Sequence, residues 1–219
     1  MMEWLGVFML EVNGLSYQYN NRSLLFEDIN VSIRRGEIVG LRGFSGSGKT
    51  TMAKIIAGYV KPIEGTILLD GKPPTPNGAN PIQLVSQHPE QAINSQWKMK
   101  KILTEIGTVD HELLHTLGLR NEWLERFPSE LSGGELQRFC IARALGKKTE
   151  YLIADEMTTM LDAITQAQIW HAVLRLVKER NIGVLAISHD QQLLKALSNR
   201  IVNFEKLNNK GSFFKHSCF

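Results

Sequence analysis

The sequence contains little cysteine: only Cys140 and Cys218 occur among its 219 residues. Neither has a cysteine neighbour at the spacing of a metal site or a redox pair, which excludes a disulfide scaffold and suits the reducing cytosol. The sequence also lacks an apolar run long enough to span a bilayer. The apolar start, residues 1–10, contains Glu3 and no basic leader, so we expect no signal peptide. A role at a membrane would therefore need another chain that holds the protein there.

An excess of charge of one sign is missing as well. Lys and Arg number 25 against 22 Asp and Glu, and the charges are scattered, so the balance argues neither for nor against nucleic acid. No internal repeat or low-complexity linker divides the chain. We therefore expect a single domain over residues 1–219, large enough to bury a substantial core.

Short apolar runs bounded by glycine or charge alternate with helical patterns along much of the chain. This order predicts an α/β fold with a mainly parallel sheet. The strands expected in that sheet are residues 37–41, 82–85, 151–154, 184–188 and 201–204. Residues 8–12 and 29–33 alternate apolar with polar side chains, and 67–69 precede an Asp-Gly turn signal, so these three segments predict antiparallel strands.

Between Pro89 and Leu145 the apolar residues recur at three- and four-residue spacing, which predicts helices. We therefore expect a helical lobe, residues 88–148, inserted into the sheet domain. The apolar positions that define it are Ile102, Leu103, Ile106, Leu113, Leu114, Leu117 and Leu119.

A phosphate-binding loop is the first motif that carries chemistry. It fits G-x-x-x-x-G-K-[ST] and lies between an expected strand, 38–42, and an expected helix, 50–57, which disfavours a mere glycine-rich turn. Glycines let the backbone curl around a β-phosphate, Lys49 neutralises phosphate oxygens, and the Thr50 hydroxyl can ligate Mg²⁺. The residues expected to bind nucleotide here are Gly43, Phe44, Ser45, Gly46, Ser47, Gly48, Lys49, Thr50 and Thr51.

Acidic and polar residues follow three of the expected strands. Asp155 and Glu156 end a buried strand, where desolvation and mutual repulsion are costly unless a metal lies nearby. Asp155 is predicted to hold Mg²⁺ and Glu156 to act as general base for an attacking water. His189 can hold that water and the phosphate oxygens in line, and Gln87 can reach Mg²⁺ or the water. Alone, each would be an ordinary loop residue; the phosphate loop favours the catalytic interpretation.

The run LSGGELQR, residues 131–138, predicts a second anion site in a chain that already has one. Ser132, Gly133 and Gly134 precede an expected helix, 135–145, so uncovered N–H groups lie at its positive end. A capping serine with two loop glycines is the simpler alternative, but it says nothing of Gln137 or Arg138.

Three further residues leave alternatives open. Tyr17 and Tyr19 lie in the first β segment, and either offers a face on which adenine can stack, so spacing does not choose between them. Asp162 follows the acidic pair by a short turn. Taken alone, it is the N-cap of a helix over residues 163–177.

Together, GFSGSGKT, Gln87, LSGGELQR, YLIADE, Leu161-Asp162 and His189 occur in the order and spacing of the ATP-binding cassette (ABC) ATPases. The resemblance covers nearly the whole chain. It implies a P-loop NTPase (RecA-like) core with an antiparallel β subdomain and an inserted helical subdomain, and ATP and Mg²⁺ as cofactors. It further implies Tyr19 as the adenine-stacking aromatic, Gln87 as the glutamine that links Mg²⁺ to the transmembrane partner, and Asp162 as a dimer contact. In this family the serine and glycines of LSGGELQR contact ATP held by the opposite subunit.

Residues 155–169, DEMTTMLDAITQAQI, look like the corresponding run of the oligopeptide, dipeptide and nickel importers. This implies an ATP-hydrolysing importer subunit for a peptide, nickel or metallophore-like solute, peripheral on the cytoplasmic face of the cell membrane. Its implied partners are a second ATPase subunit, an integral membrane permease and, indirectly, a solute-binding protein, with no nucleic acid. A soluble ABC module of an enzyme or nucleic-acid assembly is the alternative; a P-loop kinase has no use for LSGGELQR. Met157 and Met160 replace the family's proline and small residue, so we expect a less rigid turn and retained activity.

Overall fold

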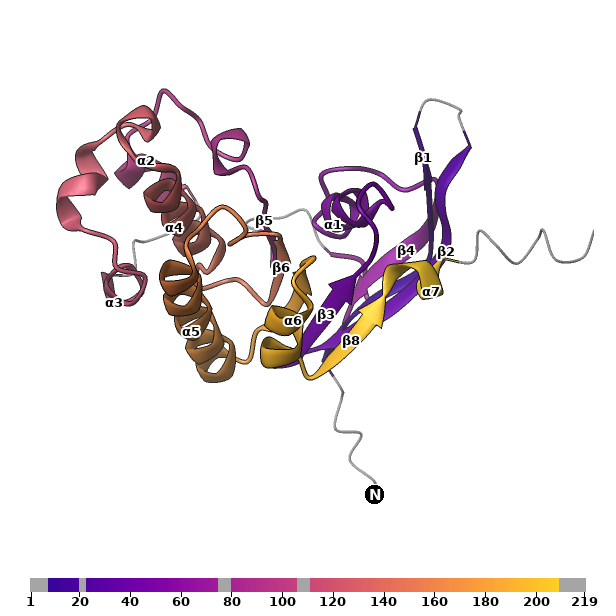
Figure 1. Cartoon of the computed structure of the whole chain (residues 1–219). Coiled ribbons are helices and arrows are strands. Elements are labelled where there is room, and N and C mark those ends of the chain that lie inside the picture. The colour runs from indigo at the N-terminus through magenta and orange to yellow at the C-terminus, as the bar shows by residue number, and fades with distance from the viewer. Residues whose placement is uncertain (1–7, 20–22, 75–79, 106–110, 209–219) are drawn as a thin grey trace, which may run out of the picture.

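The computed structural model describes residues 8–19, 23–74, 80–105 and 111–208, and every structural statement below concerns these ranges. Three features named from the sequence lie outside them, namely residues 1–7, Ile106 and Cys218. Figure 1 shows the molecule with its antiparallel strands at one end, α2, α3 and α4 at the other, and the parallel strands between them.

The central sheet is five-stranded with the order β5-β6-β7-β3-β8, and each neighbouring pair is parallel. This confirms the predicted parallel sheet. Its strands are β3 (Ile38–Arg42), β5 (Ile82–Val85), β6 (Tyr151–Asp155), β7 (Gly183–Ile187) and β8 (Arg200–Asn203). The last strand ends one residue before the prediction, because the Asn203 side chain caps a short helix, α7 (Phe204–Leu207), by accepting the Glu205 N–H at 2.9 Å.

A second sheet is antiparallel, with the order β2-β1-β4. Its strands are β1 (Met9–Gln18), β2 (Leu24–Arg34) and β4 (Glu64–Leu69), all longer than the predicted segments. The second half of β1 escapes the alternation rule because register shifts follow Val12, and Gly14 there has a φ of +63°. In β2, Asp28 with a φ of +51° interrupts the alternation in the same way.

Helices connect and cover the sheets. Helix α1 (Lys49–Ile56) follows β3, and α5 (Ala163–Arg180) and α6 (Gln191–Leu197) follow β6 and β7. Between β5 and β6 lie α2 (Met99–Thr104), α3 (His111–Thr116), α4 (Gly133–Ala144) and the 3₁₀ turns η1 (Pro89–Gln91), η2 (Asn121–Glu125) and η3 (Pro128–Glu130). No helix among the described ranges has both the length and the apolar character needed to cross a membrane.

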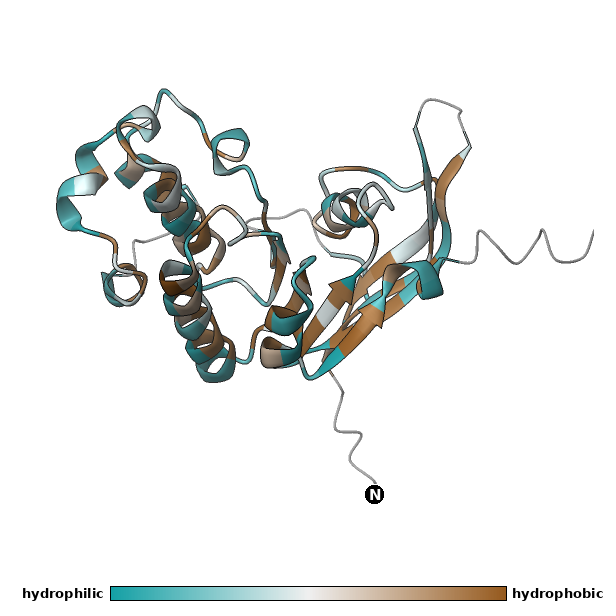
Figure 2. Ribbon diagram, viewed as in Figure 1, coloured by the Kyte–Doolittle hydropathy of each residue, from teal (hydrophilic) through white to brown (hydrophobic). Residues whose placement is uncertain are grey.

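The core has two apolar layers, one on each face of the parallel sheet. On one face, Ile153 and Leu185 pack with α1 and the antiparallel sheet. On the other face, Leu152 and Val184 pack with α4 and α5. Figure 2 shows the parallel strands as largely hydrophobic, as expected for strands covered on both sides. This double cover leaves the strand ends as the place where polar groups gather.

Candidate functional site

The phosphate loop lies between β3 and α1, where the sequence predicts it, and its conformation requires glycine. Gly48 caps α1 with a φ of +111°, and a Cβ atom there would lie 2.9 Å from Phe26 Cδ1. Gly46 has a φ of +75°. A Cβ atom at Gly43 would lie 2.8 Å from a carboxylate oxygen of Glu205. Backbone therefore lines the loop at positions where any side chain would clash or strain it.

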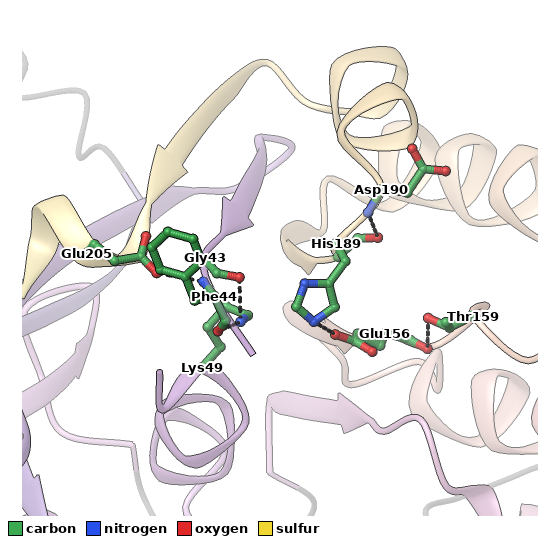
Figure 3. Close-up of polar contacts among 9 residues, drawn as sticks. Gly43, Phe44, Lys49, Glu156, Thr159, His189, Asp190 and Glu205 are labelled. Carbon is green, nitrogen blue, oxygen red and sulfur yellow. Dashed lines mark hydrogen bonds and ion pairs between the residues drawn. The ribbon is translucent and has the colours of Figure 1, made fainter. Parts of the chain in front are cut away.

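Lys49 is held against the loop that precedes it. Its side chain is buried, and its ammonium donates to the carbonyl oxygens of Gly43 at 2.9 Å and Phe44 at 2.7 Å, as Figure 3 shows. The cation is thus fixed at the start of α1, within the loop predicted to bind phosphate. Burial and fixed geometry strengthen its attraction for an anion relative to a solvated lysine.

A cavity of about 370 Å³ opens beside the loop at the carboxyl ends of β3, β6 and β7. Ligand sites of α/β sheets occupy this place. Residues from six separate segments line it: Tyr19, Leu25, Ser45, Gly46, Gly48, Lys49, Thr50, Thr51, Gln87, Glu156 and His189. The structure thus brings together most of the residues that the sequence singles out. Of those predicted at this nucleotide site, Gly43, Phe44, Ser47 and Asp155 are not part of the lining.

Asp155 ends β6 and is buried behind this surface, with 5% of its area exposed. Burial raises the pKa of its carboxyl group above the ordinary value, a hydrogen bond with the Thr50 side chain opposes the rise, and the Glu156 charge adds to it. A buried carboxylate beside a hydroxyl is an oxygen donor set that Mg²⁺ accepts. The pairing of Asp155 with Thr50 joins the acidic strand end to the phosphate loop.

Glu156 follows β6 in a left-handed conformation, with a φ of +51°. Its N–H donates to the Ile187 carbonyl at 3.0 Å, which fastens it to the end of β7. His189 Nε2 lies 2.8 Å from Glu156 Oε1, and the two side chains point toward each other in Figure 3. A non-glycine residue at positive φ is uncommon and clusters at functional sites. Here it aims the Glu156 carboxylate at His189 in the cavity.

The two tyrosines are separated by their surroundings. Tyr19 lines the cavity, is 50% exposed, and shares a hydrogen bond of 2.7 Å with the Thr51 hydroxyl. Tyr17 packs edge-on against Tyr19 with ring centroids 5.0 Å apart and is not part of the lining. The ring available for stacking at the cavity is therefore that of Tyr19.

The LSGGELQR run begins α4, as predicted. Ser132 is the N-cap: its hydroxyl accepts the Glu135 N–H at 3.3 Å, and the Glu135 carboxylate accepts the Ser132 N–H at 2.8 Å. The simpler capping interpretation is thus realised. A Cβ atom at Gly133 would meet nothing within 4 Å, so the helix start is open on that side. An open helix start is also where an anion binds.

Gln137 and Arg138 have roles that the sequence did not reveal. The buried Gln137 amide donates to the carbonyl oxygens of Met157 at 2.7 Å and Ser86 at 3.1 Å. Arg138 donates to the Leu117 carbonyl at 3.3 Å. Gln137 therefore ties α4 to the segments that follow β5 and β6. The turn after the acidic pair is held by the hydrogen bond from Gln137 to the Met157 carbonyl and by the burial of the Met157 side chain. The Met160 side chain is exposed.

The helix start faces a second cavity, of about 580 Å³, which shares no lining residue with the first. Ser132, Gly134, Asp162 and Arg126 are among its lining residues. Asp162 caps α5 by accepting the N–H groups of Thr165 at 2.9 Å and Ile164 at 3.1 Å. These hydrogen bonds, that of Thr165 first, lower the pKa of Asp162. The chain thus carries a second cavity, at the open start of α4, that is separate from the one beside the phosphate loop.

Comparison with known proteins agrees with this geometry. A family model described as ABC transporter matches residues 26–159. The nickel import system ATP-binding protein NikE of Staphylococcus aureus (strain bovine RF122 / ET3-1) is 35% identical, over 89% of this chain and 85% of the relative. The same protein of strain N315 is 34% identical with the same coverage.

Solved structures show the same fold. An ATP-binding subunit of an ABC transporter superposes with a TM-score of 0.76 at 23% identity, covering 89% of this chain and 85% of that one. A dimeric bacterial ABC transporter cassette gives 0.74 at 25% identity, covering 89% and 93%. With the phosphate loop, the acidic strand end and the open start of α4, these matches show that the chain is an ATPase of the ABC transporter family.

Proposed function

We propose that this ATPase powers an importer by hydrolysing ATP at a site shared between two cassettes. The observation that carries the proposal is the separation of its two cavities. One holds Lys49, Glu156 and His189, and the other holds Ser132, Gly134 and Asp162. A single nucleotide on the phosphate loop has no use for the second cavity of the same chain. Two chains arranged head to tail would complete two sites, and the similarity to a dimeric cassette supports this arrangement.

Within each site, Glu156 is the proposed general base. Its carboxylate lies 2.8 Å from His189 Nε2, a distance at which the imidazole can orient it toward an attacking water and hold phosphate oxygens in line. Tyr19 is proposed to stack on adenine and the phosphate loop to hold the triphosphate. Gln87 lines the same cavity and precedes the α2–α4 region. We therefore propose that it reaches Mg²⁺ or the attacking water as that region moves.

Thr50, Asp155 and Gln87 are the residues proposed to hold Mg²⁺. A hydroxyl, a carboxylate and an amide oxygen are the hard ligands that this ion takes alongside phosphates and waters. The buried Asp155 carboxylate, whose charge is disfavoured by burial, fits such a use, because a cation would relieve that cost. When bound, Mg²⁺ supplies neutralisation of phosphate charge.

We further propose that residues 88–148 act as a helical lobe that contacts a separate integral membrane permease on the cytoplasmic face of the membrane. A second ATPase subunit, identical or different, and a solute-binding protein complete the proposed importer. The similarity to a protein named for nickel import favours nickel or a nickel-bearing metallophore as cargo, with short peptides as the competing class.

Replacing the base tests the chemistry. Glu156→Gln keeps the shape of the side chain but removes the proton acceptor, so ATP turnover should fall by about 10²-fold or more. Because ATP would persist between the two chains, the variant should elute as a dimer with ATP and as a monomer without it. Glu179→Gln, an exposed carboxylate change on α5, is the matched control. Brisk hydrolysis by Glu156→Gln would contradict the assignment.

Co-purification tests the importer. The tagged chain, extracted from its own membranes in mild detergent, should bring down integral membrane proteins; recovery of soluble partners alone would favour a soluble module instead. When the recovered complex is placed in vesicles with its solute-binding protein, nickel should stimulate ATP hydrolysis. Stimulation of ATP hydrolysis by dipeptides and not by nickel would assign short peptides as the cargo.

A further inference from the structure

Glu205 lies against the phosphate loop although 161 residues separate it from Phe44. Its Oε1 atom accepts the Phe44 N–H at 2.6 Å, the contact drawn in Figure 3. The approach is close enough that Gly43 cannot carry a side chain, because a Cβ atom would lie 2.8 Å from Oε1 and 2.9 Å from Phe204 Cβ. The Glu205 carboxylate thus accepts a hydrogen bond from a backbone N–H group of the phosphate loop.

The same peptide group is held from its other side. Lys49 Nζ donates at 2.9 Å to the Gly43 carbonyl, which belongs to the peptide that contributes the Phe44 N–H. This single peptide lies between an ammonium and a carboxylate, with its dipole aligned to both. The N–H and the C=O of one peptide lie in a fixed plane, so a hydrogen bond to one of them also orients the other. The orientation of the peptide is therefore fixed by Lys49 and Glu205 together.

The position of Glu205 is set by elements outside the loop. Strand β8 pairs with β3, the Asn203 side chain caps α7, and Phe204 is fully buried with its ring edge-on to Phe26 at 5.9 Å. Asn208 accepts the Glu27 N–H at 3.0 Å and fastens the end of α7 to β2. Glu205 therefore presents its carboxylate from a rigid support.

We propose that Glu205 is a positioning residue for nucleotide binding. Because Gly43 can adopt many backbone conformations, the peptide after it would rotate freely without an outside partner. The hydrogen bond from Phe44 N–H to Glu205 keeps the Gly43 carbonyl turned toward Lys49. The Lys49 ammonium then stays at one place in the loop and meets the triphosphate without reorganisation. The inference rests on the proposed binding of phosphate by Lys49.

Three variants of the full chain separate geometry from charge. Glu205→Gln keeps an acceptor oxygen at the same reach, Glu205→Asp keeps the charge but is one methylene too short, and Glu205→Ala removes both. Positioning predicts that the Ala and Asp variants bind ATP about tenfold more weakly, a factor that corresponds to about 1.4 kcal/mol, and that Gln stays within about twofold of the parent. Glu64→Ala, an exposed carboxylate change on β4, is the control.

Binding of a fluorescent ATP analogue gives the affinity, and steady-state hydrolysis gives the split between KM and kcat. The expected change is a raised KM with kcat within about twofold, at unchanged thermal midpoints of the Asp and Gln variants. The positioning role would be overturned if Glu205→Asp bound ATP with the affinity of the parent. It would also be overturned if Glu205→Gln bound ATP as weakly as Glu205→Ala. A parent chain that binds no ATP would instead overturn the proposed function, so the two failures are distinguishable.

Discussion

Replacing Gln137 by methionine would test whether one side chain fastens α4 to the ends of β5 and β6. Methionine has nearly the same volume and helix propensity, so the change removes the amide without opening a cavity. Two hydrogen bonds, to Met157 and Ser86, are lost. Each contributes about 1 to 1.5 kcal/mol, and the carbonyl groups left behind are difficult to satisfy.

The loss is partly offset. The Gln137 Oε1 atom is buried without a hydrogen-bond partner among the described residues, and methionine removes that unsatisfied group, which regains about 1 kcal/mol. We therefore expect Gln137→Met to lower the free energy of unfolding by about 1 to 2 kcal/mol. Gln137→Glu should cost more than Met, because it also buries a charge.

Urea unfolding followed by tryptophan fluorescence measures the change, since Trp170 and Trp123 belong to the core layer that contains α4. Gln168→Met, an exposed change on α5, is the control. An unfolding free energy within about 0.3 kcal/mol of the parent would refute the argument that these two bonds anchor the helix.

Two further predictions concern single side chains. Burial raises the pKa of the Cys140 thiol to about 12, so in a Cys218→Ser background maleimide should label the folded chain at pH 8 far more slowly than the urea-unfolded chain. Equal labelling rates would contradict the burial. The Asp162 carboxylate caps α5 and its pKa is lowered, so its stabilisation is present above pH 3.8 and is lost as pH falls through the lower folded pKa. Asp162→Ala should therefore reduce the urea midpoint at pH 7, with a difference that shrinks in acid, and Asp162→Asn, which keeps an acceptor oxygen without the charge, should lie between Ala and the parent at pH 7. If the urea midpoint of Asp162→Ala stays below that of the parent by the same amount in acid, the result would argue against a role for the ionised carboxylate.

The parallel sheet and most of the first cavity could be predicted from the sequence, because their signals are local. A glycine-rich loop, a buried strand that ends in acids and a histidine after a strand each occupy a few consecutive residues. Parallel topology then brings their carboxyl ends to one edge without further information. Spacing left Tyr17 and Tyr19 open, and only the family resemblance implied Tyr19. The structure adds that Tyr19 is exposed and lines the cavity, whereas Tyr17 packs against Tyr19.

The features that escaped prediction depend on distant contacts or on broken periodicity. Glu205 meets the phosphate loop only because β8 lies beside β3, and a glutamate after the last strand gives no local signal of that contact. Gln137 is recognisable as part of LSGGELQR, but its two carbonyl partners lie 20 and 51 residues away. The second half of β1 was missed because a bulged strand abandons the alternation by which strands are recognised.

The placement of the two cavities on one chain has a consequence for where ATP is consumed. If each site needs halves from two copies, as proposed, turnover at low protein concentration should rise with the square of the concentration, and a dilute chain should spare ATP. A permease that holds two copies side by side would replace that dependence with a high effective concentration. Futile hydrolysis away from the transporter would then be limited by dilution alone, with no inhibitor required.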